Sequence, residues 1–227
     1  MMGGPGSAIL LVGSPKGGAS TSEALGRYLL DGLAGRGIET RVAHVLRSLR
    51  SEEGQRDLLR SVGAAGLLIL AAPLYVDSLP SGVTRMFEIF ATEHSGKDRL
   101  GGKRFVALIN CGFPEANHCD TAVDICRYFA REAGMEWAGG LSLGGGEAIG
   151  GKSLSEAGGV ARNARKALDM AAEALAVGRP VPEEAVSLMA AQAVSTWLYT
   201  LIGDIGWRLK ARRHGAGSRL RDRPYRR

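Results

Sequence analysis

Residues 8–22 read AILLVGSPKGGASTS, and this stretch decides the fold class of the chain. Its five leading apolar residues end at Gly13, which is typical of a strand buried on both faces of a parallel sheet. Glycine and hydroxyl residues follow, and apolar side chains then recur at helical spacing over residues 20–33. A strand, a glycine-rich loop and a helix in this order predict the opening unit of a layered α/β domain.

The same alternation continues along the chain. Four further candidate strands lie at residues 40–45, 66–72, 104–110 and 137–143. Segments with helical periodicity lie at residues 52–62, 81–92, 120–133 and 155–175. Strands that alternate with helices favour a parallel sheet covered on both faces, with right-handed crossovers. We therefore predict a three-layer α/β sandwich around a five-stranded parallel sheet.

Two prolines mark the end of this pattern. Pro180 and Pro182 are expected to separate a main domain at residues 1–179 from a C-terminal extension at residues 180–227. Within the extension, residues 183–213 have the composition of one long helix.

The extension also carries an uncharged segment and a basic tail. Residues 185–203 hold no charged side chain, and residues 208–227 hold nine of the 29 Lys and Arg but one of the 23 Asp and Glu. We expect the uncharged segment to pack on the domain or on a second copy in a homo-oligomer. Contact with an anionic membrane surface and a membrane span remain open as alternatives. The tail is interpreted as solvated, and no nucleic acid is expected as a partner.

Composition restricts the remaining classes. The chain of 227 residues is 45% apolar and 23% charged, as in ordinary globular proteins. Its three cysteines are an odd number, which favours free thiols in a reducing compartment over a disulfide framework. The first residues lack a basic segment followed by a long apolar run, so no secretory signal is predicted and a cytoplasmic location is expected.

The loop that leaves the first strand is a candidate anion site. A loop at a helix N-terminus presents backbone N–H groups to a phosphate, and the two glycines permit tight curvature. Its hydroxyl side chains can donate further hydrogen bonds. The candidate residues are Ser14, Lys16, Gly17, Gly18, Ser20, Thr21 and Ser22. The alternative is an ordinary helix start, which needs one capping hydroxyl. The dinucleotide pattern G-x-G-x-x-G is absent from this loop.

Two further loops are expected at the same crevice. With the strand order 2-1-3-4-5, the order reverses between the first and third strands, and ligands of such sheets bind at that point. The loop after the third strand contributes Pro73, Leu74, Tyr75, Val76 and Asp77. The loop after the fourth strand contributes Cys111, Gly112 and Phe113.

These loops resemble those of a known family. Gly13-Ser14-Pro15 with its Gly/Ser/Thr-rich continuation resembles the FMN phosphate loop of the NAD(P)H-dependent FMN reductases. It also resembles that of the related iron–sulfur flavoproteins and multimeric flavodoxins. The segment from Pro73 to Asp77 resembles the flavin-contacting loop of the same family. The resemblance covers about residues 9–154 and implies a flavodoxin-like fold with bound FMN.

The resemblance also implies an activity. NAD(P)H would reduce the flavin, which would pass electrons to a small-molecule or protein acceptor. The isoalloxazine would lie between the second and third loops, with Tyr75 stacked on it or at its edge and Asp77 near a ring nitrogen. For Phe113 a place in the core is an equal alternative, and Cys111 is interpreted as a small buried thiol. No catalytic side chain is predicted. A flavodoxin-type electron carrier without turnover is the alternative function.

Two other patterns point to chemistry that the context does not favour. Residues 146–153 fit the Walker A pattern G-x-x-x-x-G-K-S, but they follow the last predicted strand, so a P-loop NTPase is a distant alternative. Cys111, Cys119 and Cys126 are spaced too widely for an iron–sulfur ligand run, and no metal is predicted.

Overall fold

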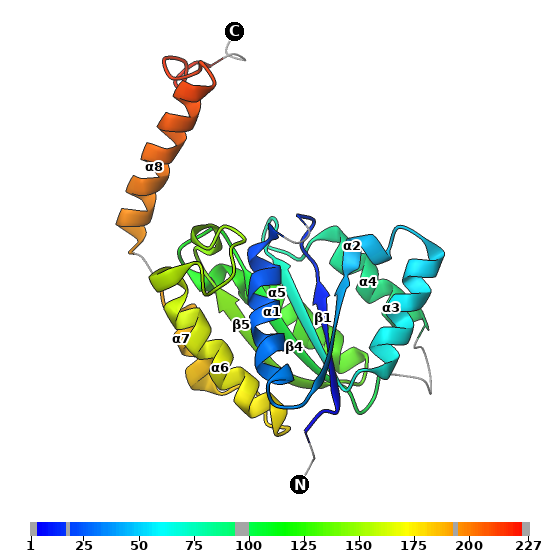
Figure 1. The fold of residues 1–227 in the computed structure, drawn as a ribbon. Helices are drawn as coiled ribbons and strands as arrows, with labels where there is room; N and C mark the ends of the chain where they lie inside the picture. Colours follow the sequence, from blue (N-terminus) through cyan, green and yellow to red (C-terminus); the bar gives the residue numbers. More distant parts are fainter. Residues whose placement is uncertain (1–3, 17–18, 94–99, 193–194, 224–227) are drawn as a thin grey trace. The chain divides into compact units, whose positions relative to one another are not determined.

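The computed structural model describes residues 4–16, 19–93, 100–192 and 195–223 (Figure 1). Its parallel sheet has the order β2-β1-β3-β4-β5, as predicted. The strands are β1 (Ser7–Val12), β2 (Glu39–His44), β3 (Leu67–Pro73), β4 (Arg104–Asn110) and β5 (Glu136–Leu143). Each begins and ends close to its predicted bounds. The central strands β1, β3 and β4 are almost fully buried, and such strands show up as plain apolar runs.

Helices connect the strands and cover the sheet. They are α1 (Thr21–Ala34), α2 (Val45–Ser48), α3 (Glu52–Ala64), α4 (Ser81–Glu93), α5 (Asp120–Glu132), α6 (Arg162–Ala176), α7 (Glu183–Ala190) and α8 (Thr196–Arg213). Single 3-10 turns form η3 (Ala116–Cys119), η4 (Gly146–Ala148) and η5 (Gly158–Ala161). The sequence did not indicate α2 or η3, since neither is long enough to show a helical period.

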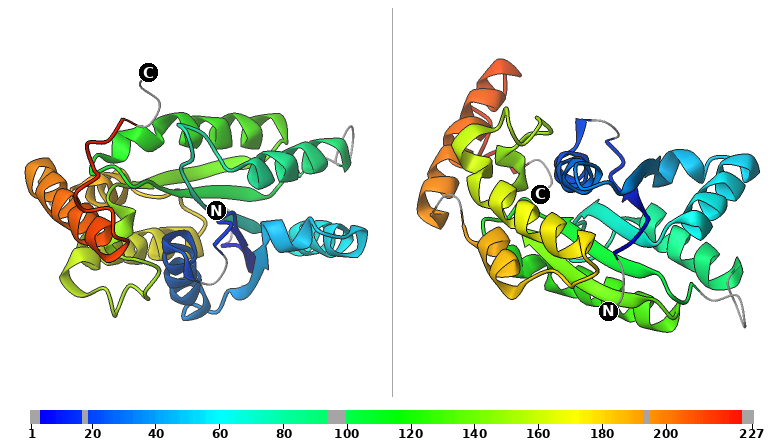
Figure 2. Two further views of the ribbon diagram at one scale, coloured as in Figure 1. Left: turned by 90° about the horizontal axis from the view of Figure 1, so that it is seen from above. Right: turned by 60° about the horizontal axis from the view of Figure 1, so that its bottom comes forward.

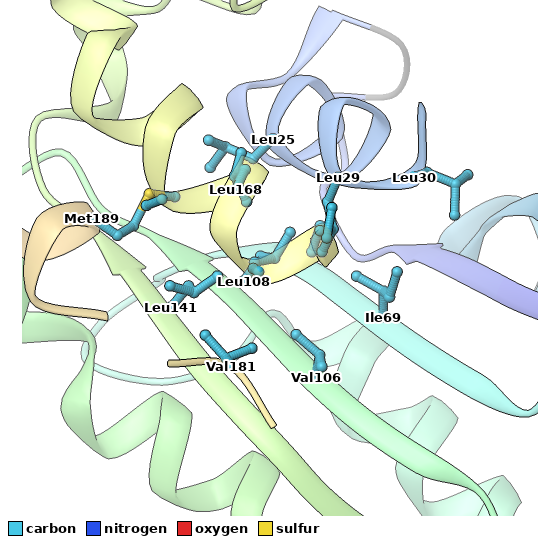
Figure 3. Close-up of a cluster of buried hydrophobic side chains, with 14 of the residues drawn as sticks. Leu25, Leu29, Leu30, Ile69, Val106, Leu108, Leu141, Leu168, Val181 and Met189 are labelled. Carbon is cyan, nitrogen blue, oxygen red and sulfur yellow. The ribbon is translucent and has the colours of Figure 1, made fainter. Parts of the chain in front are cut away.

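Helices cover both faces of the sheet (Figure 2), and alternate residues of β4 face opposite helical layers. In β4, Val106 and Leu108 join the core under α1, α6 and α7, while Phe105 and Ala107 join the core under α3, α4 and α5. Figure 3 shows the first of these cores, with Leu108 below the α6 residue Leu168. The result is the predicted three-layer sandwich, whose strands all end at one edge.

The prediction of a helix over residues 155–175 was wrong at its start. Residues 154–157 form turns, and α6 begins only at Arg162. Gly158 adopts φ +61, which interrupts a right-handed helix. The side chain of Glu156 is also turned back, where it accepts hydrogen bonds from the N–H and the hydroxyl of Ser153.

The prediction of one long helix over residues 183–213 was also wrong. Helix α7 ends at Ala190, since the next residue, Ala191, is extended with a ψ of 125°, and α8 begins at Thr196. Two compact units result, Met1–Ala193 and Val194–Arg227. The first unit therefore extends past the expected boundary at residue 179.

Packing explains why α7 belongs to the first unit. The N–H of Val181 donates to the carbonyl oxygen of Ala138 in β5, which holds the α6–α7 connection on the sheet. Ala185 and Met189 are then fully buried in the core that α1 and α6 share. Proline-rich composition marks a change of element, but this burial decides where the compact unit ends.

The second unit is dominated by α8. None of the residues of this helix is buried, and its exposed apolar side chains include Trp197, Leu201, Ile202, Ile205, Trp207 and Leu209. Arg208 pairs with Asp204 at 2.9 Å. Across the described ranges, no helix combines the length and the apolar character that crossing a membrane requires.

Candidate functional site

A cavity of about 450 Å³ lies at the carboxyl ends of β1, β3 and β4, where the strand order reverses. Its size is within the range of small-molecule sites. The lining residues are Ser14, Lys16, Ala19, Ser20, Thr21, Ser22, Pro73, Leu74, Tyr75, Asn110, Cys111, Gly112, Gly146, Glu147, Gly150 and Gly151. The three loops that the sequence singled out therefore meet in one cavity.

Two hydroxyl groups of the first loop accept hydrogen bonds and show no acceptor for their own protons among the described residues. The Oγ of Ser14 accepts from the N–H of Lys16 at 3.3 Å. The Oγ of Ser20 accepts from the N–H of Glu23 at 3.2 Å, so Ser20 is the N-cap of α1. An accepting hydroxyl still has its own proton to donate. Both side chains are buried against the cavity, at the positive end of the α1 dipole.

The other two hydroxyl groups of this loop are committed to the protein. Thr21 Oγ1 donates to the carbonyl oxygen of Gly146 at 2.8 Å. Ser22 Oγ donates to Oδ1 of Asn110 at 2.6 Å. Each hydroxyl has one proton, so Thr21 and Ser22 brace the loop rather than offer a side-chain donor to an anion.

The remaining candidates of the first loop are Lys16, Gly17 and Gly18. Lys16 lines the cavity from an exposed position and can bring a positive charge to an anion. Gly17 and Gly18 lie outside the described residues.

The second loop contains a tight turn. Tyr75 and Ser78 exchange backbone hydrogen bonds of 2.9 and 3.1 Å, and Val76 and Asp77 between them adopt φ +48 and +55. Pro73, Leu74 and Tyr75 line the cavity, whereas the described lining does not include Val76 or Asp77. Contact of Val76 or Asp77 with a ligand stays a prediction.

This turn predicts a stabilising substitution. A positive φ is unfavourable for valine because its branched Cβ crowds the backbone, and asparagine tolerates it. Val76 is 98% exposed, so no packing is lost. Val76→Asn is expected to raise the free energy of unfolding by about 1 kcal/mol, measured by urea denaturation. Val177 is exposed at φ −99, so Val177→Asn is the control and should change little. Equal effects of the two changes would contradict this reading of the turn.

The third loop follows β4 directly. Cys111 is 3% exposed, as expected for a small buried thiol, and lines the cavity beside Gly112. Phe113 is 53% exposed and its ring lies 4.3 Å from that of His118. The alternative that placed Phe113 in the core is therefore wrong, although the described lining does not include this ring either.

The site also contains residues that the sequence predictions had not selected. Asn110 is buried at the end of β4, where its carbonyl oxygen accepts from Leu74 and its side chain accepts from Ser22. Asn110 therefore links the loops that follow β1, β3 and β4. A polar residue that ends a buried strand is a signal that could have identified it. Glu147 adds a carboxylate to the lining.

The loop that fits the Walker pattern packs on the first loop instead of forming a P-loop. A Cβ on Gly151 would lie 2.1 Å from the carbonyl oxygen of Ala19, and one on Gly146 would lie 3.2 Å from that of Cys111. No helix begins at Lys152 or Ser153, whereas a P-loop opens directly into one. The glycines of this pattern are explained by close packing, and the NTPase alternative is not supported.

A buried carboxylate stands beside the site. Glu23 is 3% exposed and accepts hydrogen bonds from Arg27 Nε at 2.7 Å and, when His44 carries a proton on Nε2, from that nitrogen at 3.1 Å. Burial alone raises the pKa of Glu23, but the hydrogen bonds from Arg27 and His44 outweigh it and hold this pKa below its ordinary value of 4.5.

Glu23 therefore predicts acid sensitivity. Because its pKa is lower in the folded chain than in the unfolded chain, it stabilises the fold above pH 4.5, and this contribution is lost as the pH falls through the folded value. In urea denaturation, Glu23→Gln should reduce the stability difference between neutral and acid pH. Glu39→Gln, which alters an exposed ion pair, is the control. A pH profile of Glu23→Gln that parallels the unsubstituted chain would contradict the prediction.

Within the described part of the chain, no group of three or more His, Cys, Asp or Glu side chains is placed to hold a metal ion. Cys111, Cys119 and Cys126 are all buried and free.

Comparison with known proteins gives structural likenesses only. No protein-family model matches the chain, and no curated protein sequence matches it. The structure of RosB with bound 8-demethyl-8-formylriboflavin-5′-phosphate is similar at a TM-score of 0.57 and 14% identity, over 96% of this chain and 90% of that one.

Two reductases are also similar. An FMN-dependent NADH-azoreductase from Bacillus anthracis, solved in complex with FMN, has a TM-score of 0.54 and 17% identity over 75% of this chain and 99% of that one. A flavone reductase has a TM-score of 0.56 and 16% identity over 74% of this chain and 62% of that one. With the strand order, these likenesses identify the fold as flavodoxin-like, as predicted.

Proposed function

We propose that this chain binds FMN in the cavity at the ends of β1, β3 and β4 and works as a flavin-dependent oxidoreductase with NAD(P)H as electron donor. The observation that carries the proposal is the convergence of two proton-bearing hydroxyls, Ser14 and Ser20, with the N-terminus of α1 in this cavity. The FMN-bound azoreductase and RosB with its riboflavin phosphate derivative have the same fold. They support the choice of a flavin phosphate over other anions.

The residues present fit the phosphate end of FMN. A monoester dianion needs several hydrogen-bond donors. Ser14 and Ser20 supply hydroxyl protons, the first turn of α1 supplies backbone N–H groups, and Lys16 supplies positive charge. Thr21 and Ser22 contribute indirectly, because their hydrogen bonds to Gly146 and Asn110 keep the loop in place before the ligand arrives.

The rest of the cavity suits a flat, partly apolar ring. Leu74 and Tyr75 lie on one side and Cys111 and Gly112 on another, so the ring would lie between the second and third loops. Tyr75 offers an aromatic surface for stacking. When bound, FMN supplies hydride and electron transfer, while the chain positions the ring and limits access to it. The acceptor would be a small molecule or a protein that reaches the open side.

The hydroxyl assignment predicts different effects for two adjacent residues. Ser20→Ala should weaken FMN binding by about 1–3 kcal/mol, because it removes a hydrogen bond to a charged group. Thr21→Ala should weaken it less, since the Thr21 proton goes to Gly146. Titration of the apoprotein with FMN, followed by fluorescence quenching, measures both.

A third variant separates binding from helix capping. Ser51 caps α3 through the N–H of Gly54, as Ser20 caps α1, but it does not line the cavity. Ser51→Ala should lower stability to a similar degree and leave FMN affinity unchanged. A larger loss of FMN affinity in Thr21→Ala than in Ser20→Ala would mean that the phosphate is assigned to the wrong hydroxyl.

The proposed activity has a direct test. The purified chain should retain or take up FMN in equimolar amount, and it should consume NADH or NADPH in the presence of a quinone or an azo dye. FMN binding without consumption would favour an electron carrier. Failure to bind FMN after reconstitution would overturn the proposal.

A further inference from the structure

A second cavity, of about 290 Å³, lies along α1. Residues of α1 form one part of its wall, and Gly151 with the turns of residues 153–155 forms the rest. Gly151 lines both cavities and lies against Ala19 of the first loop. The second cavity therefore begins beside the loop that is proposed to hold the phosphate, and the glycine places no side chain between the two cavities.

The lining residues of α1 form one stripe that runs from the first cavity into the second. Side chains three and four residues apart lie on the same face of a helix. The stripe consists of Ser20, Glu23, Ala24, Arg27, Tyr28 and Asp31. At the rise of an α-helix it covers about 16 Å of the helix axis, counted from the N-cap. A ligand whose phosphate is anchored at the N-terminus of α1 can therefore continue along this face.

The exposed charges of this stripe follow one another along the helix. Arg27 donates from Nε to Glu23 at 2.7 Å, and its two terminal nitrogens donate no hydrogen bond within the described part of the chain. Its side chain is 52% exposed, whereas that of Glu23 is 4% exposed. Because guanidinium groups bind phosphate through such free N–H pairs, Arg27 is suited to a second phosphate beyond the first loop.

One turn further along α1, Asp31 is exposed at the same cavity. Its carboxylate accepts no hydrogen bond from another described residue. A carboxylate can accept hydrogen bonds from a sugar hydroxyl or from the amino group of a base. The stripe thus offers a cation first and a hydrogen-bond acceptor after it, which is the order of phosphate and nucleoside in a nucleotide.

The remaining surface of the cavity is uncharged. Leu154 is buried, Ala24 and Tyr28 are partly buried, and Ser155 adds an exposed hydroxyl. Aliphatic and aromatic surface of this kind suits the flat face of a base. The volume is at the lower end of the range for small-molecule sites, so it suits a nucleoside with one phosphate better than a whole dinucleotide.

We propose that the second cavity binds the adenosine 5′-phosphate group of a dinucleotide, with the phosphate at Arg27 and the ribose or the base at Asp31. FAD carries this group on the phosphate of its FMN half, and NAD carries it on the phosphate of its nicotinamide half. The common border at Gly151 favours FAD, because a chain that continues from the FMN phosphate leads directly into the second cavity. The inference rests on the proposed function, since the FMN half is the anchor in the first cavity.

The first experiment compares each dinucleotide with its half. The apoprotein is titrated with FAD and with FMN, and the FMN-loaded protein is titrated by calorimetry with NAD⁺ and with nicotinamide mononucleotide. We expect FAD to bind at least tenfold more tightly than FMN, and NAD⁺ to bind no more tightly than its half. A gain for NAD⁺ alone would keep the adenosine site and assign it to the electron donor. No gain for either dinucleotide would overturn the inference.

The second experiment narrows the cavity. Ser155 is exposed at its border, so Ser155→Trp adds bulk without disturbing the core. This change should reduce the affinity for FAD about tenfold, towards that for FMN. Thr92→Trp is the matched control, because Thr92 is exposed on α4 and lines neither cavity, and it should leave both affinities unchanged. An unchanged preference for FAD in Ser155→Trp would place the adenosine group elsewhere and overturn the inference.

The two failures can be told apart. If the apoprotein binds neither FMN nor FAD, the proposed function fails and the inference fails with it. If FMN binds and NAD(P)H is consumed, but neither dinucleotide binds more tightly than its half, only the adenosine site is wrong.

Discussion

Gly151→Ala is expected to lower the free energy of unfolding by about 3 kcal/mol or more and to reduce FMN binding strongly. An alanine Cβ there would lie 2.1 Å from the carbonyl oxygen of Ala19 and 2.6 Å from its carbonyl carbon. Those atoms are backbone, so they cannot turn aside as a side chain can. The first loop or the loop after β5 would have to move. Either movement disturbs the cavity that both loops line.

Gly150 provides a matched control for this substitution. It lies next in the chain, lines the same cavity and also adopts a positive φ, +62 against +74 for Gly151. A Cβ on Gly150 would meet only the carbonyl oxygen of Glu147, at an ordinary 3.5 Å. Gly150→Ala should therefore cost about 1 kcal/mol, from backbone strain alone.

Urea denaturation and FMN titration of both variants measure the difference. We expect Gly150→Ala to bind FMN with nearly the affinity of the unsubstituted chain. Equal losses in the two variants would show that the positive φ, and not the approach of the two loops, sets the cost. The contact between Gly151 and Ala19 would then have no special importance for the site.

Phe105→Ala is expected to have the other large effect, a loss of about 3–5 kcal/mol in the free energy of unfolding. Phe105 is fully buried in β4 under α4 and α5. Its ring makes edge contacts with Phe87 and Phe129, at centroid distances of 6.2 and 6.0 Å, and a tilted contact with Trp137. Truncation would leave a cavity among rings that the sheet and helices hold in place.

The exposed Phe113 is the control for Phe105. Phe113→Ala should change stability by less than about 1 kcal/mol, because this ring loses only its contact with His118. Thermal and urea denaturation compare the two. A similar loss in both variants would mean that the loop after β4 is a structural part of the core. If Phe113→Ala alone alters FMN affinity, this ring contributes to the cofactor site.

The central strands could be predicted from the sequence because β1, β3 and β4 are buried on both faces. Residues 105–109 are a continuous apolar run, and β4 has the predicted bounds of residues 104–110. The first loop was equally clear, since a strand that ends at Gly13 and a helix that starts at Ser20 leave little choice about where the loop lies. Local composition is sufficient to predict a strand when all of its residues are buried.

The C-terminal third of the chain was harder to predict. Residues 155–175 and 183–213 are rich in residues that favour helices, so propensity alone indicates two long helices. The breaks lie at Gly158, which adopts φ +61, and at Ala191, which is extended, and helix propensity does not indicate either backbone conformation. Helix propensity is a weak preference that tertiary contacts override.

The amino-acid sequence alone determined the order of strands and helices, the loops that meet at the edge of the sheet and the hydroxyl residues among them. Only the tertiary structure decided which hydroxyls donate within the protein, and that Asn110 and the glycines Gly146, Gly150 and Gly151 complete the cavity. The physical reason is that hydrophobic periodicity is a local property of the chain. The hydrogen-bond partner of a hydroxyl group can be a residue that is distant in the sequence, as Gly146 is for Thr21.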